Sequence, residues 1–330
     1  MPSVTATPAD RFAAFKRRVD KALQSVDLPE QPAALYDPVR YVLAGGGKRL
    51  RPALVLLSAQ AFGADEARAL PAALAVEVFH NFTLVHDDIM DHAAERRGRP
   101  TVHVKWDEST AILAGDLLMG MAYDLLAQTE TDRLGEMLRV FGAMLRRLCE
   151  GQTLDEQFEN TDRVTVGDYL RMIEGKTGAL LECAMELGGL VGGASSAHRE
   201  ALRQAGADLG RAFQIQDDLL DLTADHAALG KRIGGDLIEG KKTYLLLRAL
   251  EAAKGDEHAW FARIPQTGGL PPDEVDEARR RMARLGVLDE ARQTTLDYYA
   301  RGEAALDALP QGEAVEALRW LARQMGQRIR

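Results

Sequence analysis

The sequence predicts an all-α protein: a single large bundle of about ten or more helices, in one domain spanning residues 1–330. Three observations support this. Apolar residues recur at helical spacing in most segments, and no convincing alternating strand occurs between them. Clusters of glycine and proline separate the periodic segments, as expected for connections between helices. The number of periodic segments is too large for a four-helix bundle.

The first helix has a clear start. Thr7, Pro8 and Asp10 match an N-cap, a proline at the first helical position and an acid three residues after the cap. Phe12 and Phe15 then follow at helical spacing. Further helices are expected at about 53–62, 71–91, 109–128, 133–150, 166–190, 199–221 and 243–252, with two or three more after residue 273.

Composition excludes several classes of protein. Hydrophobic residues make up 46% of the chain and charged residues 28%, the balance of a globular protein with ample material for a core. The formal net charge of −9 argues against a nucleic-acid binder, which needs an excess of positive charge. No apolar run of about 18 residues predicts a transmembrane segment, and the N-terminus lacks the pattern of a secretory signal. Cys149 and Cys183 are too few for a disulfide framework, so we expect a reducing, cytoplasmic setting.

An acidic cluster, DDIMD at 87–91, ends the long helix expected at 71–91. Asp87 and Asp91 are four residues apart and therefore lie on one helix face. Like charges at this spacing destabilise a helix, and the C-terminus is the unfavourable end of the helix dipole for an anion. Three carboxylates at this place, with Asp88 between the other two, therefore require a compensating cation. Oxygen ligands at this density suit Mg²⁺, which takes one or two carboxylates, waters and phosphate oxygens.

A second cluster, DDLLD at 217–221, repeats this spacing with Asp217, Asp218 and Asp221 on a largely apolar helix. If the two helices face each other, six carboxylates line one central cavity, which divalent cations make tolerable. The alternative is a solvated acidic face, a fair interpretation of one such cluster in so acidic a protein. Two clusters on apolar helices favour the metal site.

Basic and polar side chains recur beside both clusters. A glycine turn at 45–47 runs into a helix and carries Lys48, Arg49 and Arg51 with it, a suitable arrangement for an anion. Each candidate alone has an ordinary interpretation as part of a solvated loop or of the core, but together they fit a substrate with two phosphates. The others are His80, Arg96, Arg97, Lys176, Thr177, Gln214, Lys231 and Lys241.

Five segments contain most of these residues. They are GGGKRLRP at 45–52, FTLVHDDIMDHAAERRGRPTVH at 82–103, GKTGAL at 175–180, FQIQDDLLD at 213–221 and GKRIGGDLIEGKKT at 230–243. In content and order these segments resemble the trans-isoprenyl diphosphate synthases, the family of farnesyl and geranylgeranyl diphosphate synthases. The resemblance implies the all-α isoprenoid synthase fold. It also implies an enzyme that condenses isopentenyl diphosphate head to tail with dimethylallyl, geranyl or farnesyl diphosphate.

The resemblance implies a role for each candidate residue. Three Mg²⁺ ions are expected on the allylic diphosphate, held by Asp87, Asp91 and Asp217 with support from Asp88, Asp218 and Asp221. Contacts to the allylic diphosphate are expected from Arg96, Lys176, Thr177, Gln214, Lys231 and Lys241, of which Arg96 and Lys176 are also catalytic candidates. Contacts to isopentenyl diphosphate are expected from Lys48, Arg51, His80 and Arg97. Because members of the family are usually homodimers, we expect a homodimer.

The resemblance also bears on product length, which this family sets with bulky side chains below the first acidic cluster. Phe82 and Thr83 lie five and four residues before Asp87. One aromatic residue followed by a small one resembles synthases of the geranylgeranyl type, although ordinary core packing explains Phe82 equally well. A twenty-carbon product is favoured, and the fifteen-carbon farnesyl product is the alternative.

Two other kinds of protein share the implied fold. A terpene cyclase usually replaces the second cluster with a different acidic motif and needs no isopentenyl site. A non-catalytic regulatory subunit generally lacks one acidic cluster. This chain has both clusters as well as the glycine turn with Lys48, which favours the synthase.

Overall fold

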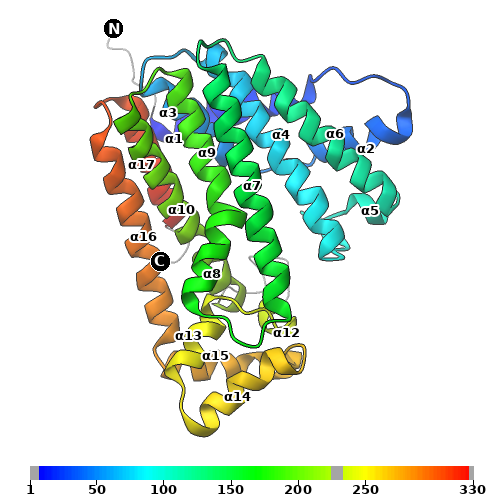
Figure 1. The fold of residues 1–330 in the computed structure, drawn as a ribbon, viewed down its shortest axis with the longest axis vertical. Coiled ribbons are helices and arrows are strands. Elements are labelled where there is room, and N and C mark those ends of the chain that lie inside the picture. Colours follow the sequence, from blue (N-terminus) through cyan, green and yellow to red (C-terminus); the bar gives the residue numbers. More distant parts are fainter. Residues whose placement is uncertain (1–6, 224–232, 327–330) are drawn as a thin grey trace. The chain divides into compact units, whose positions relative to one another are not determined.

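The computed structural model describes residues 7–223 and 233–326, and these residues are predominantly helical (Figure 1). The predicted all-α class is confirmed. In this part of the chain the only strands are β1 (Glu95–Arg96) and β2 (Arg99–Pro100), which pair antiparallel. The sequence analysis did not predict this hairpin, because two-residue strands are too short for an alternating pattern.

Backbone contacts divide the chain into two compact units. Among the described residues, unit 1 comprises 7–142, 183–203 and 308–320, and unit 2 comprises 143–182, 204–223, 233–307 and 321–326. Both units receive residues from α7 (Leu134–Glu159), α9 (Ala179–Val191), α10 (Ser196–Thr223), η3 (Leu306–Ala308) and α17 (Glu313–Gly326). The single domain expected from the sequence remains a prediction.

Unit 1 contains the N-terminal helices and the first acidic cluster. Its helices include α1 (Pro8–Gln24), α2 (Ala33–Leu43), α3 (Leu50–Gln60), α4 (Glu66–Met90), α5 (Val102–Lys105) and α6 (Glu108–Ala127). The predicted start of α1 is confirmed: Thr7 Oγ1 accepts the Asp10 N–H at 3.2 Å, and the Asp10 carboxylate accepts the Thr7 N–H at 3.3 Å. This reciprocal pair is a capping box.

The helix α4 begins earlier than the sequence analysis predicted, at Glu66 rather than near residue 71. Asp65 caps it by accepting the N–H of Arg68 at 2.8 Å. α4 lies side by side with α6 in Figure 1, and small buried residues of α6, Ala114 and Gly115 among them, allow the close approach. α6 therefore supports α4, the helix that ends in the first acidic cluster.

One described helix, α6, is long and apolar enough to cross a membrane, judged by length and composition alone. The sequence analysis expected no such segment. In the structure α6 packs along α4, and 33% of its most apolar stretch is buried. One helix of this kind is weak evidence for a membrane span, because the core helix of a soluble protein passes the same test.

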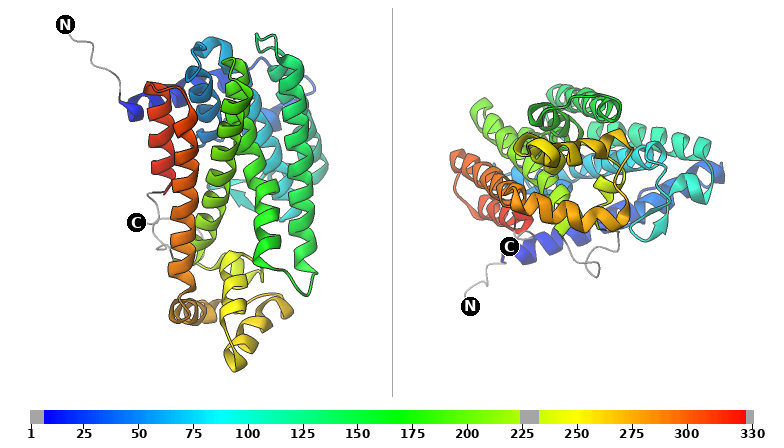
Figure 2. Two further views of the ribbon diagram at one scale, coloured as in Figure 1. Left: turned by 60° about the vertical axis from the view of Figure 1, so that its left-hand side comes forward. Right: turned by 90° about the horizontal axis from the view of Figure 1, so that it is seen from below.

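Unit 2 contains the second acidic cluster, on α10. Its other elements are α8 (Val166–Ile173), the π-helix η1 (Glu174–Gly178), α12 (Gly235–Ile238), α13 (Tyr244–Ala252), α14 (Gly255–Gln266), the 3-10 helix η2 (Pro272–Glu274), α15 (Val275–Arg284) and α16 (Val287–Ala305). Figure 2 shows α13, α14 and α15 gathered at one end of α16. The helices after residue 273 agree with the prediction.

The continuous helix predicted over 166–190 is interrupted by η1. This π-helix forms where two backbones approach closely. A Cβ at Gly151 of α7 would lie 2.2 Å from the backbone nitrogen of Lys176, and a Cβ at Gly175 would lie 2.5 Å from the carbonyl oxygen of Arg147. Short π-helices are frequent at functional sites. Here the irregular turn sets the positions of Lys176 and its neighbours.

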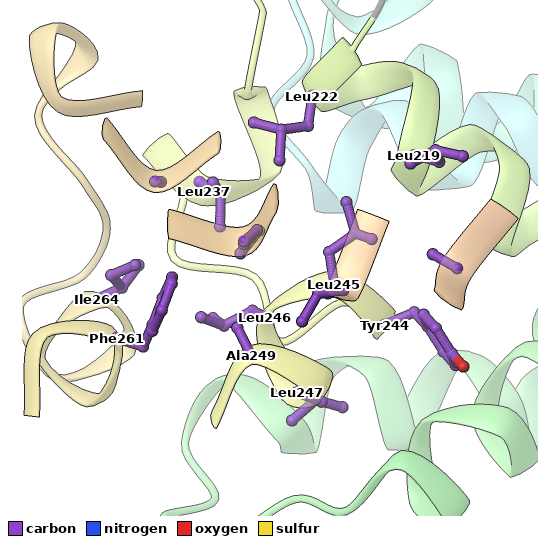
Figure 3. Packing of buried hydrophobic residues seen from close by; sticks show 14 of the residues in the cluster. Leu219, Leu222, Leu237, Tyr244, Leu245, Leu246, Leu247, Ala249, Phe261 and Ile264 are labelled. Atoms are coloured by element: carbon purple, nitrogen blue, oxygen red, sulfur yellow. The ribbon is translucent and has the colours of Figure 1, made fainter. Parts of the chain in front are cut away.

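A hydrophobic cluster in unit 2 fixes the orientation of the second acidic helix (Figure 3). Leu219 and Leu222 of α10 are almost fully buried in it, together with Leu245 of α13 and Phe261 of α14. Because these leucines are interspersed with the aspartates of the cluster, burying them determines in which direction each aspartate points.

Candidate active site

The three carboxylates at the end of α4 lie in different surroundings. Asp88 is buried, Asp87 is half-buried, and Asp91 is exposed at the C-cap of the helix. Asp88 Oδ1 accepts a hydrogen bond from Arg96 Nε at 2.7 Å. Burial raises the pKa of Asp88, and the charge of Arg96 partly opposes that rise. Asp88 is thus anchored to Arg96, while Asp87 and Asp91 lie closer to solvent.

Arg96 and Arg97 are positioned by the hairpin of β1 and β2. Arg97 and Gly98 form its two-residue turn with φ values of 54° and 72°, and positive values at both positions are typical of a type I′ turn. The guanidinium of Arg97 donates a hydrogen bond to the carbonyl oxygen of Gly46. This bond brings the hairpin against the glycine turn, so two segments that are far apart in the sequence meet.

Arg49 has a structural role within the glycine turn. It is almost fully buried, and its guanidinium donates to Asp20 at 2.7 Å and to Glu77 at 2.5 Å. Burial works to lower the pKa of Arg49, but the two carboxylates more than offset it, so the pKa is raised. Lys48, the preceding residue, is exposed. The sequence did not separate Arg49 from the neighbouring cations, because its acidic partners are distant along the chain.

His80 lies beside Arg51, with Arg51 Nη1 3.1 Å from His80 Nε2. A guanidinium only donates, so Nε2 accepts and the ring proton sits on Nδ1. Burial lowers the pKa of His80 well below its usual value, and the charges of Arg51, Arg97, Arg96 and Arg49 lower it further. His80 is therefore neutral near pH 7, and the structure brings the basic residues of the glycine turn and of the hairpin around it.

A small cleft of about 60 Å³ lies next to this group in unit 1. Its wall includes Asp88, Arg96, Arg97 and Arg99. The guanidinium of Arg99 lies 3.8 Å from the ring centroid of Tyr41, a cation–π contact that holds it in place. Sequence reasoning missed Arg99 and Tyr41. The concentration of guanidinium groups suits an anionic ligand.

The second acidic cluster, in unit 2, also combines an exposed and a buried aspartate. Asp217 is exposed, whereas Asp218 is buried. The Asp218 carboxylate accepts hydrogen bonds from the Tyr169 hydroxyl at 2.5 Å, the Tyr244 N–H at 3.1 Å and Gln214 Nε2 at 3.2 Å. Sequence reasoning missed both tyrosines, since at helical spacing each resembles an ordinary core residue.

Burial also changes the acidity of this group. It raises the pKa of Asp218 well above its usual value, and the neighbouring charge of Asp236 raises it further. Burial likewise raises the pKa of Tyr169 well above its usual value, and the charge of Asp218 raises it further. Asp218 and Tyr169 therefore form a hydrogen-bonded anchor inside unit 2.

The π-helix η1 presents Lys176 and Thr177. Lys176 Nζ lies 2.5 Å from Asp155 Oδ2 of α7. The Thr177 hydroxyl donates to Gln214 Oε1 at 2.9 Å, and Gln214 in turn donates to Asp218. A chain of hydrogen bonds thus joins η1 to the second acidic cluster.

Asp221 fixes the glycine turn before α12. Its carboxylate accepts the N–H of Asp236 at 3.1 Å, and its carbonyl oxygen accepts the N–H of Gly234 at 2.8 Å. Lys241 Nζ lies 2.8 Å from Glu239 Oε2. Lys231 lies outside the described residues.

Phe82 and Thr83 lie on α4 one turn before the first cluster. The ring of Phe82 is half-buried, with its centroid 5.2 Å from Phe79 and 4.7 Å from His86. Thr83 is buried, and its hydroxyl donates to the carbonyl oxygen of His80 at 2.9 Å. Phe82 is therefore part of an aromatic group that continues along α4.

The donor set fits a metal that binds together with a ligand. In residues 7–223 and 233–326, no three His, Cys, Asp or Glu side chains are grouped closely enough to hold a metal ion by themselves. Mg²⁺ usually takes only one or two carboxylates and completes its shell with water and phosphate oxygens. Each cluster offers a solvent-accessible aspartate, Asp91 or Asp217, close in sequence to an anchored one. Such an arrangement suits a divalent cation that arrives with a phosphate.

Comparisons with known proteins identify the family. The model of the family described as polyprenyl synthetase matches residues 32–282. A geranylgeranyl diphosphate synthase of Methanosarcina mazei is 41% identical over 305 residues, which cover 92% of each chain. The crystal structure of geranylgeranyl pyrophosphate synthetase from Pyrococcus horikoshii is similar with a TM-score of 0.90 at 38% identity, covering 97% of this chain and 98% of that one. That of polyprenyl synthase from Caulobacter crescentus, complexed with calcium and isoprenyl diphosphate, gives 0.85 at 32% identity, covering 98% and 96%. The chain belongs to the polyprenyl synthetase family, the trans-isoprenyl diphosphate synthases.

Proposed function

We propose that this chain is a Mg²⁺-dependent prenyltransferase that condenses isopentenyl diphosphate head to tail with an allylic diphosphate. The main product is geranylgeranyl diphosphate, and dimethylallyl, geranyl and farnesyl diphosphates are the allylic substrates. The proposal is carried by the pair of acidic clusters, each with a buried, anchored aspartate and an exposed one, in a chain of this family.

The proposed reaction depends on charge stabilisation and needs no nucleophilic side chain. Breaking the allylic C–O bond leaves a carbocation and a diphosphate with additional negative charge. Cationic groups placed where that charge develops stabilise the transition state more than the ground state. Arg96 and Lys176 are proposed for this task, with further contacts from Thr177, Gln214, Lys231 and Lys241. The isopentenyl double bond then attacks the cation, and loss of a proton completes the condensation.

The two proposed catalytic cations already have carboxylate partners. Arg96 donates to Asp88 at 2.7 Å, and Lys176 lies 2.5 Å from Asp155. These pairs restrict the side chains before any substrate binds, which lowers the entropy lost when they contact a diphosphate. We propose that this restriction prepares both side chains to contact the leaving group.

Mg²⁺ is proposed to bind with the allylic diphosphate, and we expect three ions. When bound, the metal supplies positive charge that stabilises the leaving diphosphate. The proposed principal ligands are the half-buried or exposed carboxylates of Asp87, Asp91 and Asp217. The residues proposed to support them, which accept hydrogen bonds from protein groups, are Asp88, Asp218 and Asp221.

Incubation with labelled isopentenyl diphosphate and each short allylic diphosphate, followed by sizing of the products, tests the proposal. We expect elongation in the presence of Mg²⁺, its loss on adding EDTA and its recovery when Mg²⁺ is restored. Full turnover without a divalent metal would exclude the metal's role. If none of the allylic diphosphates is elongated, the proposed function is wrong.

His80 is proposed to act by holding Arg51 towards isopentenyl diphosphate, because it is neutral and accepts a hydrogen bond from Arg51. His80→Ala removes a hydrogen bond to a charged group and should raise the KM for isopentenyl diphosphate about tenfold. His80→Gln retains an acceptor and should stay within about threefold of the wild type. Equal KM values for the two variants would contradict this role.

The pH dependence follows from the same contact. Because the pKa of His80 is lowered from 6.5, the ring that accepts from Arg51 is neutral above pH 6.5. The stability that this neutral ring contributes is fully present above pH 6.5 and is lost as the pH falls towards the lowered pKa. The KM for isopentenyl diphosphate should therefore show no histidine titration between pH 6.5 and about 8. A titration in that range that disappears in His80→Gln would show that His80 is charged.

Phe82 is proposed as the floor that stops the growing chain. Phe82→Ala removes the ring and should lengthen the main product by one or more five-carbon units. The check is sizing of products from labelled isopentenyl diphosphate at equal conversion. An unchanged product distribution would leave Phe82 with a packing role only, in contact with Phe79 and His86.

A cytoplasmic homodimer is proposed as the working form. Large apolar side chains exposed in the described residues all lie between positions 90 and 138: Met90, Val104, Ile112, Leu113 and Leu138. Exposed apolar side chains of this size are candidates for a surface that a partner covers. Leu113→Glu should shift the mass measured by light scattering from dimer towards monomer. A monomeric wild type, or a dimer unaffected by the substitution, would contradict this surface.

A further inference from the structure

The ring of His86 fills the space in which any side chain at position 115 would lie. A Cβ on Gly115 of α6 would be 2.2 Å from His86 Nε2 and 2.4 Å from His86 Cδ2. The same ring nitrogen lies 3.3 Å from the carbonyl oxygen of Ile112 and 3.9 Å from Asp116 Oδ1. His86 of α4 is thus seated in a notch of α6 that stays open only because residue 115 is glycine.

His86 also contacts Phe82, one helical turn earlier on α4. Their ring centroids are 4.7 Å apart with an interplanar angle of 65°, an edge-to-face arrangement. Phe82 also contacts Phe79 at 5.2 Å, and Phe79 contacts Phe141 of α7 at 5.1 Å. Phe82 therefore has an aromatic neighbour on either side along α4, and one of them, His86, is held by α6.

We propose that His86, seated in the Gly115 notch, is a positioning residue that keeps Phe82 across the path of the growing prenyl chain and thereby limits product length. The inference rests on the proposed function and on Phe82 as the floor. A half-buried aromatic ring can change rotamer unless its neighbours restrict it. His86 restricts Phe82 from one side, and the notch restricts His86. His86 acts on the product through Phe82 and contacts no substrate itself.

Gly115→Ala tests the notch by adding one methyl group. The added Cβ cannot coexist with the present position of the His86 ring, so the ring must leave and Phe82 loses its edge-to-face partner. We expect the ratio of longer products to the main product to rise about three- to tenfold, the change in rotamer population that one such contact supports. Gly120→Ala is the matched control, because nothing lies within 4 Å of a Cβ at that position of the same helix. It should leave the ratio unchanged.

A double-mutant cycle shows whether the effect passes through His86. His86→Ala should raise the ratio by itself, and adding Gly115→Ala should raise it no further, because the methyl group then meets the space vacated by the ring. The product ratios are compared at equal conversion. A slower turnover, caused by a disturbance of the neighbouring Asp87, therefore does not change the comparison. His86→Ala also provides the answer if Gly115→Ala does not fold.

The outcomes separate this inference from the proposed function. An unchanged ratio in His86→Ala, together with longer products from Phe82→Ala, would refute the positioning role and leave the prenyltransferase intact. Fully additive effects of His86→Ala and Gly115→Ala would show that the notch acts by another route, and would also refute it. Failure of the wild type to elongate any allylic diphosphate would refute the proposed function itself.

Discussion

Asp217→Ala is expected to lower the rate of chain elongation about a thousandfold, the loss that corresponds to removing about 4 kcal/mol of transition-state stabilisation. Asp217 is the exposed aspartate of its cluster and is proposed as a principal ligand of Mg²⁺. Without its carboxylate, the metal charge that stabilises the leaving diphosphate is less firmly held. Alanine is a good helix former, so α10 should keep its structure, which circular dichroism can check. The rate is measured with labelled isopentenyl diphosphate at saturating substrate.

The control for Asp217→Ala is Asp124→Asn, which removes the charge of an exposed aspartate on α6 outside both acidic clusters. Its rate should stay within about twofold of the wild type, because exposed charges far from the chemistry contribute little. The Mg²⁺ concentration for half-maximal rate should rise in Asp217→Ala and stay constant in Asp124→Asn. A folded Asp217→Ala enzyme that loses less than about tenfold in rate would contradict the proposed role.

Much of the fold could be predicted because its helices carry local patterns. The start of α1 is specified by Thr7 and Asp10, three residues apart, and the structure contains the expected capping box. The exceptions lack a local pattern. The π-helix η1 depends on a close approach between Gly151 and Gly175, which are 24 positions apart, and the hairpin at Arg97 has strands too short for periodicity. Contacts that are distant in sequence leave no trace in the spacing of apolar residues.

The candidate site was predicted as a set of residue types, but the division of labour within it was not. Asp217 and Asp218 are adjacent and chemically identical in the sequence, yet only Asp218 is buried. Its partners Tyr169 and Tyr244 are 49 and 26 residues away. Likewise Arg49 is separated from its buried partner Glu77 by 28 positions. Tertiary packing therefore decides which of two neighbouring residues of the same kind, such as Asp217 and Asp218, becomes a buried anchor and which faces solvent.

Asp218→Ala is expected to lower the free energy of unfolding by an amount similar to that by which Asp217→Ala raises the activation barrier. The Asp218 carboxylate is 4% exposed and accepts hydrogen bonds from the Tyr169 hydroxyl and the Tyr244 N–H. Alanine leaves both donors buried without that acceptor, which costs about 3 kcal/mol or more in the free energy of unfolding. For a chain of 330 residues the midpoint shifts by about 1.5 °C per kcal/mol, so it should fall by about 4–5 °C. Differential scanning fluorimetry in EDTA, which excludes any effect of bound metal, measures this change.

Asp218→Asn is the comparison variant: it removes the charge, its amide oxygen still accepts from Tyr169 and Tyr244, and its amide N–H group takes the place of the oxygen that accepts from Gln214. Because the folded pKa of Asp218 is raised above 3.8, the stability linked to its protonated form is fully present below that pH and is lost as the pH rises towards the folded value. Asparagine cannot ionise, so its midpoint should approach or exceed that of the wild type as the pH rises. An alanine variant as stable as the asparagine variant would mean that the carboxylate does not anchor α10. An asparagine variant that is destabilised more as the pH rises would mean that the buried charge, rather than the hydrogen bonds, holds the helix.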